Sequence, residues 1–169
     1  MTTPMYTTSV PVFKQLLNSL SAILSKAEAF AAEKTIEPKV LLEARLYPDM
    51  FPLCRQVQIA CDFAKSVSAR LAAVEVPAYD DNEQSFAELQ ARIANTLTFI
   101  DSLTPLQFEG SETREIVLRP GTPKEKKLTG QAYLSHYGLP QFYFHVTTTY
   151  AIFRHNGLDI GKGDYMGAY

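Results

Sequence analysis

The chain has 169 residues, of which 46% are hydrophobic and 20% charged, and its formal net charge is -2 at pH 7. This length and composition are typical of a globular protein, and we expect a single domain over residues 1–169. Acidic and basic residues are interleaved, which argues against nucleic acid or a membrane surface as the main partner. No apolar run approaches the ~20 residues that span a bilayer. Residues 1–12 lack the basic start and long apolar core of a signal peptide.

The two cysteines, Cys54 and Cys61, lie on one expected helix. Their spacing places them about 10 Å apart along the helix axis. A disulfide requires Cα atoms within ~7 Å of each other, so this pair is not expected to form a bridge. Two unbridged thiols predict a reducing, cytoplasmic location, where packing as small apolar side chains is their simplest role.

The first half of the chain contains two segments with the apolar spacing of amphipathic helices. The first helix is expected over Val10–Lys34. A short helical turn opened by Glu37-Pro38 follows, and Tyr47-Pro48 breaks it. The second helix is expected to use Asp49 as its N-cap and to carry Pro52 in its first turn.

The second half predicts a third helix, a hairpin and a fourth helix. The third helix begins after Ser85, where SFAE matches a capping box. Pro120-Gly121, flanked by short apolar runs, predicts a β-hairpin. Residues 130–138 predict a separate helical turn before Pro140. The fourth helix is expected from Leu139 to Asn156, with Gly157 as its C-cap and an irregular tail beyond.

Together these elements predict an all-α fold, an antiparallel four-helix bundle with a short β-hairpin excursion between helices 3 and 4. Ligand sites in such bundles are built from inward-facing side chains of neighbouring helices. Polar residues within the apolar stripes are therefore the candidates for function.

His145 is the strongest of these candidates because it lies in the apolar stripe of the fourth helix, together with Thr149. Gln141 precedes it by one turn. On the second helix, Gln56 lies about 50° from the centre of the apolar seam, whereas Gln58 lies on the opposite flank. A glutamine that reaches solvent is an equally good interpretation of Gln56.

Two interpretations of His145 are open. In one, it is a core histidine whose ring nitrogens bond to Thr149, Gln141 or Gln56. In the other, it binds a metal or another ligand. The other histidines give little local support for a metal, because His155 is ~15 Å further along the helix and turned about 80° away, and His136 precedes Pro140. The local geometry offers one good ligand, not three.

Other chemical motifs are absent from the sequence, which lacks a nucleophile elbow, a phosphate-binding loop and a Cys-x2-Cys pair. Four residues of the fourth helix are expected on its outer face: Tyr143, Thr147, Tyr150 and Arg154. This face is interpreted either as solvated or as a contact between two copies in a dimer.

Two long blocks, FYFHVTTTYAIFRHNGLDIGKGDYMG and PDMFPLCRQVQIACDFAKSVSARL, carry a resemblance that covers nearly the whole chain. The sequence resembles an uncharacterised bacterial family with a domain of unknown function. That family is similar to the DinB/YfiT-like helical bundles, a superfamily of metal-dependent enzymes and their relatives. The resemblance implies a four-helix bundle, frequent homodimerisation and, in many relatives, a metal site.

In those relatives the metal is held by one histidine on the second helix and a His-x3-His pair on the last helix. Aligned on Arg154 and Gly157, His145 falls on the second histidine of that pair and Gln141 on the first. The third position falls on Gln56 or Gln58. Amides replace two of three imidazoles, and amides are poor ligands for zinc or nickel.

Two hypotheses follow. In the first, the protein is a dimeric DinB-like bundle with a degenerate metal site, and its polar pocket has a small-molecule-binding or structural role without a cofactor. The alternative is an enzyme of the thiol-dependent transferase or hydrolase type. It would use an atypical His/Gln site, with His145 as the best single ligand for zinc or nickel or as a general base.

Overall fold

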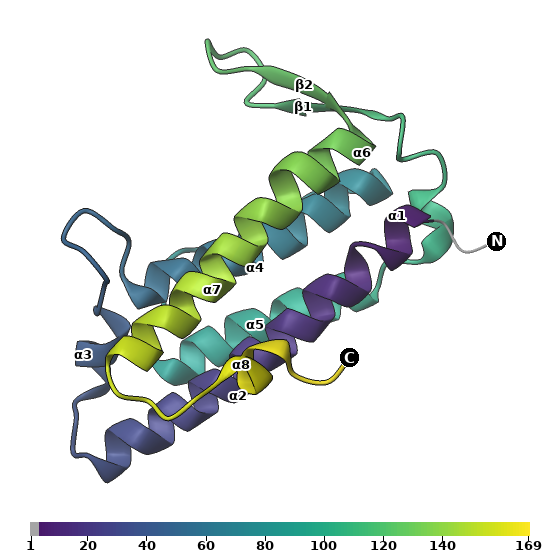
Figure 1. Cartoon of the computed structure of the whole chain (residues 1–169). Coiled ribbons are helices and arrows are strands. Elements are labelled where there is room, and N and C mark those ends of the chain that lie inside the picture. The colour runs from purple at the N-terminus through teal and green to yellow at the C-terminus, as the bar shows by residue number, and fades with distance from the viewer. Residues whose placement is uncertain (1–3) are drawn as a thin grey trace.

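Within residues 4–169, which the computed structural model describes, four long helices form a bundle (Figure 1). They are α2 (Val10–Glu33), α4 (Leu53–Ala72), α5 (Phe86–Asp101) and α7 (Leu139–His155). The short elements are α1 (Pro4–Thr7), α3 (Pro38–Leu42), η1 (Pro105–Phe108), β1 (Glu115–Leu118), β2 (Lys126–Thr129), α6 (Gly130–Ala132), η2 (Tyr133–Gly138) and α8 (Lys162–Met166). The predicted all-α bundle with a hairpin between its third and fourth long helices is confirmed. No helix in this part of the chain is both long and apolar enough to cross a membrane.

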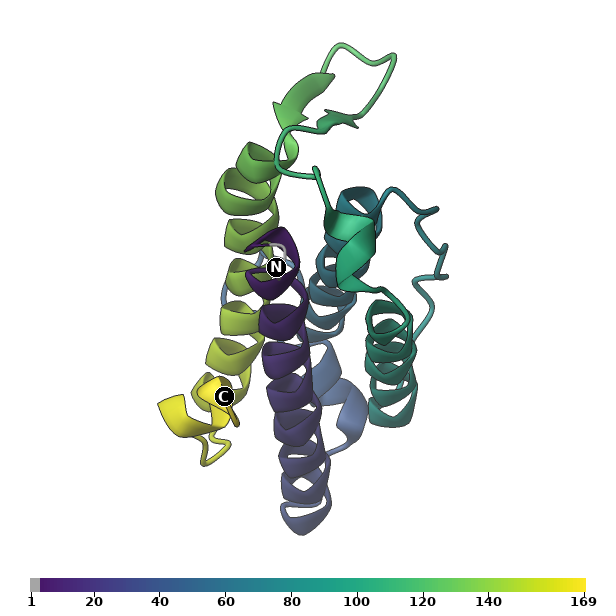
Figure 2. The same cartoon turned by 90° about the vertical axis from the view of Figure 1, so that its right-hand side faces the viewer.

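The connection between α4 and α5 runs back along the bundle, so these two helices are parallel (Figures 1 and 2). The thiol of Cys54, in the first turn of α4, donates to the main-chain oxygen of Glu83, just before α5 begins. Both helices therefore start at the same end of the molecule, so the predicted antiparallel arrangement does not hold for this pair. Helix α2 is antiparallel to both, since Lys14 near its start pairs with Asp101 at the end of α5.

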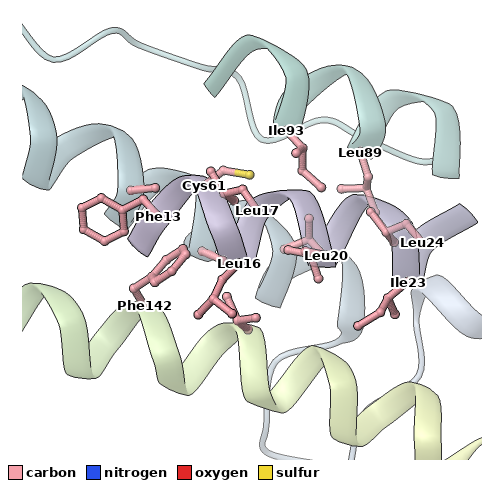
Figure 3. Packing of buried hydrophobic residues seen from close by; sticks show 14 of the residues in the cluster. Phe13, Leu16, Leu17, Leu20, Ile23, Leu24, Cys61, Leu89, Ile93 and Phe142 are labelled. Carbon is pink, nitrogen blue, oxygen red and sulfur yellow. The ribbon is translucent and has the colours of Figure 1, made fainter. Parts of the chain in front are cut away.

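The core lies between the facing apolar stripes of the four helices (Figure 3). Phe13 of α2 and Phe142 of α7 meet edge to face, with ring centroids 4.9 Å apart. Leu20 and Leu24 continue the α2 stripe, and Leu89 of α5 packs against it from the other side. This spacing by three and four residues, read from the sequence, is the reason that each helix buries one face.

Helix starts follow local capping chemistry. The Ser85 hydroxyl accepts a hydrogen bond from the Glu88 N–H at 3.2 Å, as the capping box predicts. The predicted N-cap at Asp49 is wrong, because α4 begins at Leu53 with Pro52 as its N-cap. Phe51, the residue before a proline, is held out of the helical region. Pro52 itself is extended, with a ψ of 164°, so Leu53 is the first helical residue.

The hairpin projects from the end of the bundle at which α7 begins (Figures 1 and 2). Its two strands are antiparallel, and the turn between them contains Gly121 at a φ of 73°. The register pairs Glu115 with Thr129, Ile116 with Leu128, Val117 with Lys127 and Leu118 with Lys126. Ile116 is the buried residue of β1 and joins the hairpin to the core.

The predicted break before Pro140 is absent, because α6, η2 and α7 follow one another as a continuous helical segment (Figure 1). Residues 133–138 form a π-helix. Pro140 lacks an N–H, and its ring would clash with the carbonyl four residues earlier in a regular α-helix. The wider π turns directly before it relieve that conflict. Gly138 then packs on α4, where a Cβ would lie 2.7 Å from Val67.

The tail was predicted to be irregular, and this is wrong for residues 162–166, which form α8. The Asp164 carboxylate accepts the Gly161 N–H at 2.8 Å and pairs with Lys26 of α2 at 2.6 Å. The Gln15 amide also donates to the Met166 carbonyl. These contacts hold the tail against α2, and the sequence pattern around its glycines does not reveal them.

Candidate functional site

His145 lies in the middle of α7, on the face that packs against α4, and 7% of its surface is exposed. Its Nδ1 lies 2.7 Å from Oε1 of Gln56 on α4. The Gln56 Nε2 donates to the main-chain oxygen of Phe51 at 3.1 Å. Because that carbonyl can only accept, it fixes the orientation of the Gln56 amide and turns its oxygen towards the imidazole.

This orientation assigns the proton of the ring. The Gln56 oxygen is an acceptor, so Nδ1 of His145 must carry the hydrogen and donate it. In the neutral imidazole the other nitrogen, Nε2, is then an acceptor. Within residues 4–169 Nε2 has no hydrogen-bond partner. The site therefore contains one hydrogen-bond acceptor that none of these residues uses.

Aromatic rings surround the imidazole. Phe63 of α4 stacks on it at a centroid distance of 6.0 Å, and Phe144 meets it edge to face at 5.2 Å. Phe144 is 55% exposed, and Phe51, whose carbonyl anchors Gln56, is 54% exposed. The buried imidazole thus lies beside Phe144, an apolar side chain that faces solvent.

Electrostatics keep the imidazole neutral. Burial, followed by the positive charge of Arg55, lowers the pKa of His145 from 6.5 to about 4. Desolvation disfavours the charged ring, and a nearby cation adds repulsion. At neutral pH, Nε2 consequently offers its lone pair rather than a proton.

The other residues of the predicted polar pocket are placed differently. Gln141 is half-buried and lines a shallow hollow of about 230 Å³ with His136, Tyr137, Pro140 and Phe144. Thr149 is buried, and its hydroxyl donates to the main-chain oxygen of His145 rather than to the ring. Gln58 points away from His145 and bonds to Arg55 and Glu83. The structure therefore brings Gln56, and not Gln58, to the imidazole.

Comparison with known proteins identifies the family. A family described as a domain of unknown function, DUF1993, matches residues 5–166. The chain belongs to the DUF1993 family. It is similar to a crystal structure described as a DinB family member protein from Shewanella denitrificans, with 44% sequence identity and a TM-score of 0.92. That match covers 97% of this chain and 92% of the other. Among curated proteins, none matches significantly.

The metal site of many DinB-like relatives can be tested against the side chains of this DUF1993 chain. Two ligands of one tetrahedral zinc at about 2.1 Å are roughly 3.4 Å apart, and both must present lone pairs. The Gln56 oxygen and Nδ1 of His145 are closer, at 2.7 Å, and share a proton. A metal on Nε2 would lie on the other side of the ring from Gln56.

The remaining side chains do not complete a metal site either. His136 and His155 are exposed, and neither bonds to His145. Over the described range 4–169, no group of three or more His, Cys, Asp or Glu side chains is arranged to hold a metal ion. The donor set around His145 therefore does not fit the three-imidazole site of the relatives.

A second polar cluster, which the sequence did not predict, lies where α4 packs against α5. Arg92 of α5 is 3% exposed and binds three carboxylates at 2.8 to 2.9 Å, those of Asp62, Asp81 and Glu83. Lys65 pairs with Asp62 at 3.0 Å. We call these residues, with Arg55, the Arg92 cluster. Its three cations balance its three anions.

The Arg92 cluster anchors the crossover segment 73–85 to both helices. Tyr79 of this segment lies beneath two of the cations, with Lys65 Nζ 3.8 Å and Arg92 5.4 Å from its ring centroid. The sequence did carry a signal, since Arg92 sits next to Ile93 within the apolar stripe of α5. An arginine buried there requires partners, which the acidic loop DDNE supplies.

The two thiols are unsuited to nucleophilic chemistry. Both cysteines are unbridged, with Cys61 buried in the core and Cys54 partly buried. Burial raises the pKa of Cys54 to about 11 and that of Cys61 to about 12. Because the thiolate is the reactive form, neither residue is an activated nucleophile at neutral pH.

Proposed function

We propose that this DUF1993 protein is a homodimeric bundle that binds a small molecule at His145 and has a degenerate metal site. The observation that carries the proposal is the unpartnered Nε2 of a neutral imidazole. Nε2 is not among the buried polar atoms that lack a partner, so it is accessible from solvent and can accept a hydrogen bond from a bound molecule. An accessible acceptor beside the exposed ring of Phe144 combines the polar group and the apolar surface that a ligand site uses.

The proposed absence of a resident metal is tested by elemental analysis of untagged protein purified without chelator. Wild type is compared with His145→Ala before and after incubation with Zn²⁺ or Ni²⁺. We expect less than about 0.1 equivalent of metal in both proteins, because one imidazole binds these ions weakly. One equivalent in wild type that is lost in His145→Ala would overturn the degenerate-site proposal.

Such a result would favour the alternative, an enzyme of the thiol-dependent transferase or hydrolase type. One observation supports it, namely that Nε2 holds a lone pair at neutral pH and could bind an ion or accept a proton. The same pKa of about 4 makes His145 a weak base, because a general base works best with a pKa near the operating pH. Ligand binding without catalysis therefore has the stronger support.

Self-association is proposed from the outer surface of α7. Tyr143, one of the residues expected on this outer face, is a large aromatic side chain that is 38% exposed. Size-exclusion chromatography with light scattering should give twice the monomer mass for wild type. Tyr143→Ser should shift the protein towards monomer, while His155→Ser, at an exposed position of the same helix outside this face, should not. A monomeric wild type would contradict the dimer.

The proposed location is the cytoplasm, supported by the two unbridged thiols on α4. Fractionation of cells that produce the untagged protein would check this, with the soluble cytoplasmic fraction as the expected result.

A further inference from the structure

We infer that the ligand of the His145 site is an uncharged hydrogen-bond donor on a flat apolar body, such as a phenol, and that Gln56 sets this preference. The inference rests on the proposed function and names the class of molecule that the same site takes. It follows from three features of the structure: the fixed polarity of the imidazole, the charge beside it and the rings around it.

The polarity of the site is fixed by a chain of hydrogen bonds that begins on the main chain. The Phe51 carbonyl accepts from Gln56 Nε2, and Gln56 Oε1 accepts from His145 Nδ1. Reversing the amide would set its NH₂ group against the ring N–H and leave the Phe51 carbonyl facing an oxygen. Only one orientation satisfies all three groups. Nε2 is therefore an acceptor, and a ligand must donate to it.

Charge excludes most ionic ligands. The Arg55 guanidinium acts on His145 as a positive charge and would repel a cation that approached Nε2. An anion has no hydrogen to donate and would meet the Nε2 lone pair. The Arg55 guanidinium is also occupied by the Asp81 carboxylate and the Gln58 oxygen, so it is not available as an anion anchor. An uncharged donor satisfies Nε2 without either penalty.

The surroundings of the ring favour a flat apolar body on that donor. Phe63 lies nearly parallel to the imidazole, at an interplanar angle of 12°, and Phe144 stands at 86° to it. Phe144 exposes more than half of its surface and lines the hollow of about 230 Å³ next to Gln141. A planar ligand that donates to Nε2 can cover this exposed edge and gain contact area there.

Four probes of similar size, all built on one aromatic ring, separate the effect of the donor from the effect of charge. Phenol is an uncharged donor, anisole has the same ring without the donor, benzoate is an anion and benzylammonium is a cation. Binding is followed by the nitrogen shifts of the His145 imidazole in ¹⁵N-histidine-labelled protein, with His155, exposed at the far end of α7, as internal control. We expect phenol to bind about tenfold or more tightly than each of the other three, the contribution of one buried hydrogen bond.

Gln56→Glu should reverse this order. A carboxylate at position 56 accepts from Nδ1 and stabilises the charged imidazolium, so Nε2 becomes a donor. Benzoate should then bind about tenfold more tightly than phenol. If this variant does not fold, the comparison of phenol with anisole in wild type still decides the ligand class.

The outcomes distinguish the two proposals. If no probe shifts the His145 nitrogens, the proposed function fails and this inference with it. If anisole, benzoate or benzylammonium binds as tightly as phenol to wild type, the site is real but the inferred ligand class is wrong. If phenol is preferred and folded Gln56→Glu keeps that preference, Gln56 does not set the polarity of the site.

Discussion

Two polar clusters flank α4, one around His145 where α4 meets α7 and one around Arg92 where α4 meets α5. The Arg92 cluster joins three cations to three carboxylates, and every charge has a counter-charge. In the His145 site, uncharged groups form a chain of hydrogen bonds in which His145 donates to Gln56 and Gln56 donates to the Phe51 carbonyl. The other ring nitrogen, Nε2, has no partner among residues 4–169. The first arrangement is closed and the second is open to an additional molecule. Arg92 Nε is itself buried without a hydrogen-bond partner, so the pairing of charges, rather than saturation of every donor, distinguishes the Arg92 cluster from the His145 site.

The largest effect on stability should come from removing Arg92 from its cluster. Arg92→Met leaves the Glu83 and Asp62 carboxylates without their buried partner, and we expect the free energy of unfolding to fall by about 3 kcal/mol. Urea denaturation measures this change. Lys34→Met, which removes an exposed ion pair with Glu33, is the control and should change stability by less than about 0.5 kcal/mol. A loss below about 1 kcal/mol for Arg92→Met would show that the cluster does not hold the crossover.

The next effect is a dependence of stability on pH. The pKa of His145 is about 4 in the folded protein and near 6.5 in the unfolded chain. Between these values the unfolded chain binds a proton that the folded protein does not. Stability from this residue is therefore fully present above pH 6.5 and falls as the pH drops towards 4, by an amount on the order of 2 kcal/mol.

Urea denaturation at a series of pH values tests this dependence in two matched variants. His145→Gln should lose the part of the slope between pH 6.5 and 4 that belongs to the imidazole, whereas His136→Gln should keep it. Both variants retain the carboxylates of the Arg92 cluster, so the difference between them isolates His145. Equal slopes would mean that the ring is protonated in the folded state over this range.

A smaller effect is expected from Gln56→Leu, which removes the acceptor of the Nδ1 hydrogen. A buried donor without a partner should cost about 1.5 kcal/mol. The imidazole should also lose its single tautomer, which the two ¹⁵N shifts of the ring report directly. A variant in which Nδ1 alone stays protonated would show that another group orients the imidazole.

The smallest effect concerns Arg55. Its charge contributes to the low pKa of His145, but burial contributes more. Arg55→Gln should therefore raise the pKa of the imidazole but leave it below its ordinary value. NMR titration of the ring measures this shift, and a return to the ordinary value would identify charge rather than burial as the main cause.

Much of this architecture could be predicted from local pattern. The stripes of α2 and α5, the Ser85 cap and the hairpin turn depend on neighbours within a few residues, and all were predicted. Gln56 was singled out for its angle to the α4 seam, and it is the residue that meets His145.

The failures share a cause, because each depends on contacts or compensations that apolar spacing does not encode. The parallel direction of α5 goes with the ion pairs that Arg92 forms with Asp81 and Glu83 of the crossover loop. The continuous helix through Pro140 depends on the π turns before it. Helix α8 depends on Lys26, which is distant in sequence from Asp164.

The parallel course of α4 and α5 also bears on the order in which the protein folds. The Arg92 contacts close short loops, with 9 residues to Glu83 and 30 to Asp62, whereas Gln56 and His145 are 89 residues apart. Loop-closure entropy makes the 89-residue contact roughly 1 kcal/mol more costly to form than the 30-residue one. In pulse-labelled hydrogen exchange, amides of α4 and α5 should gain protection before those of α7. The hydrogen bond between His145 and Gln56 would then form in a late step, after α4 and α5 have packed together.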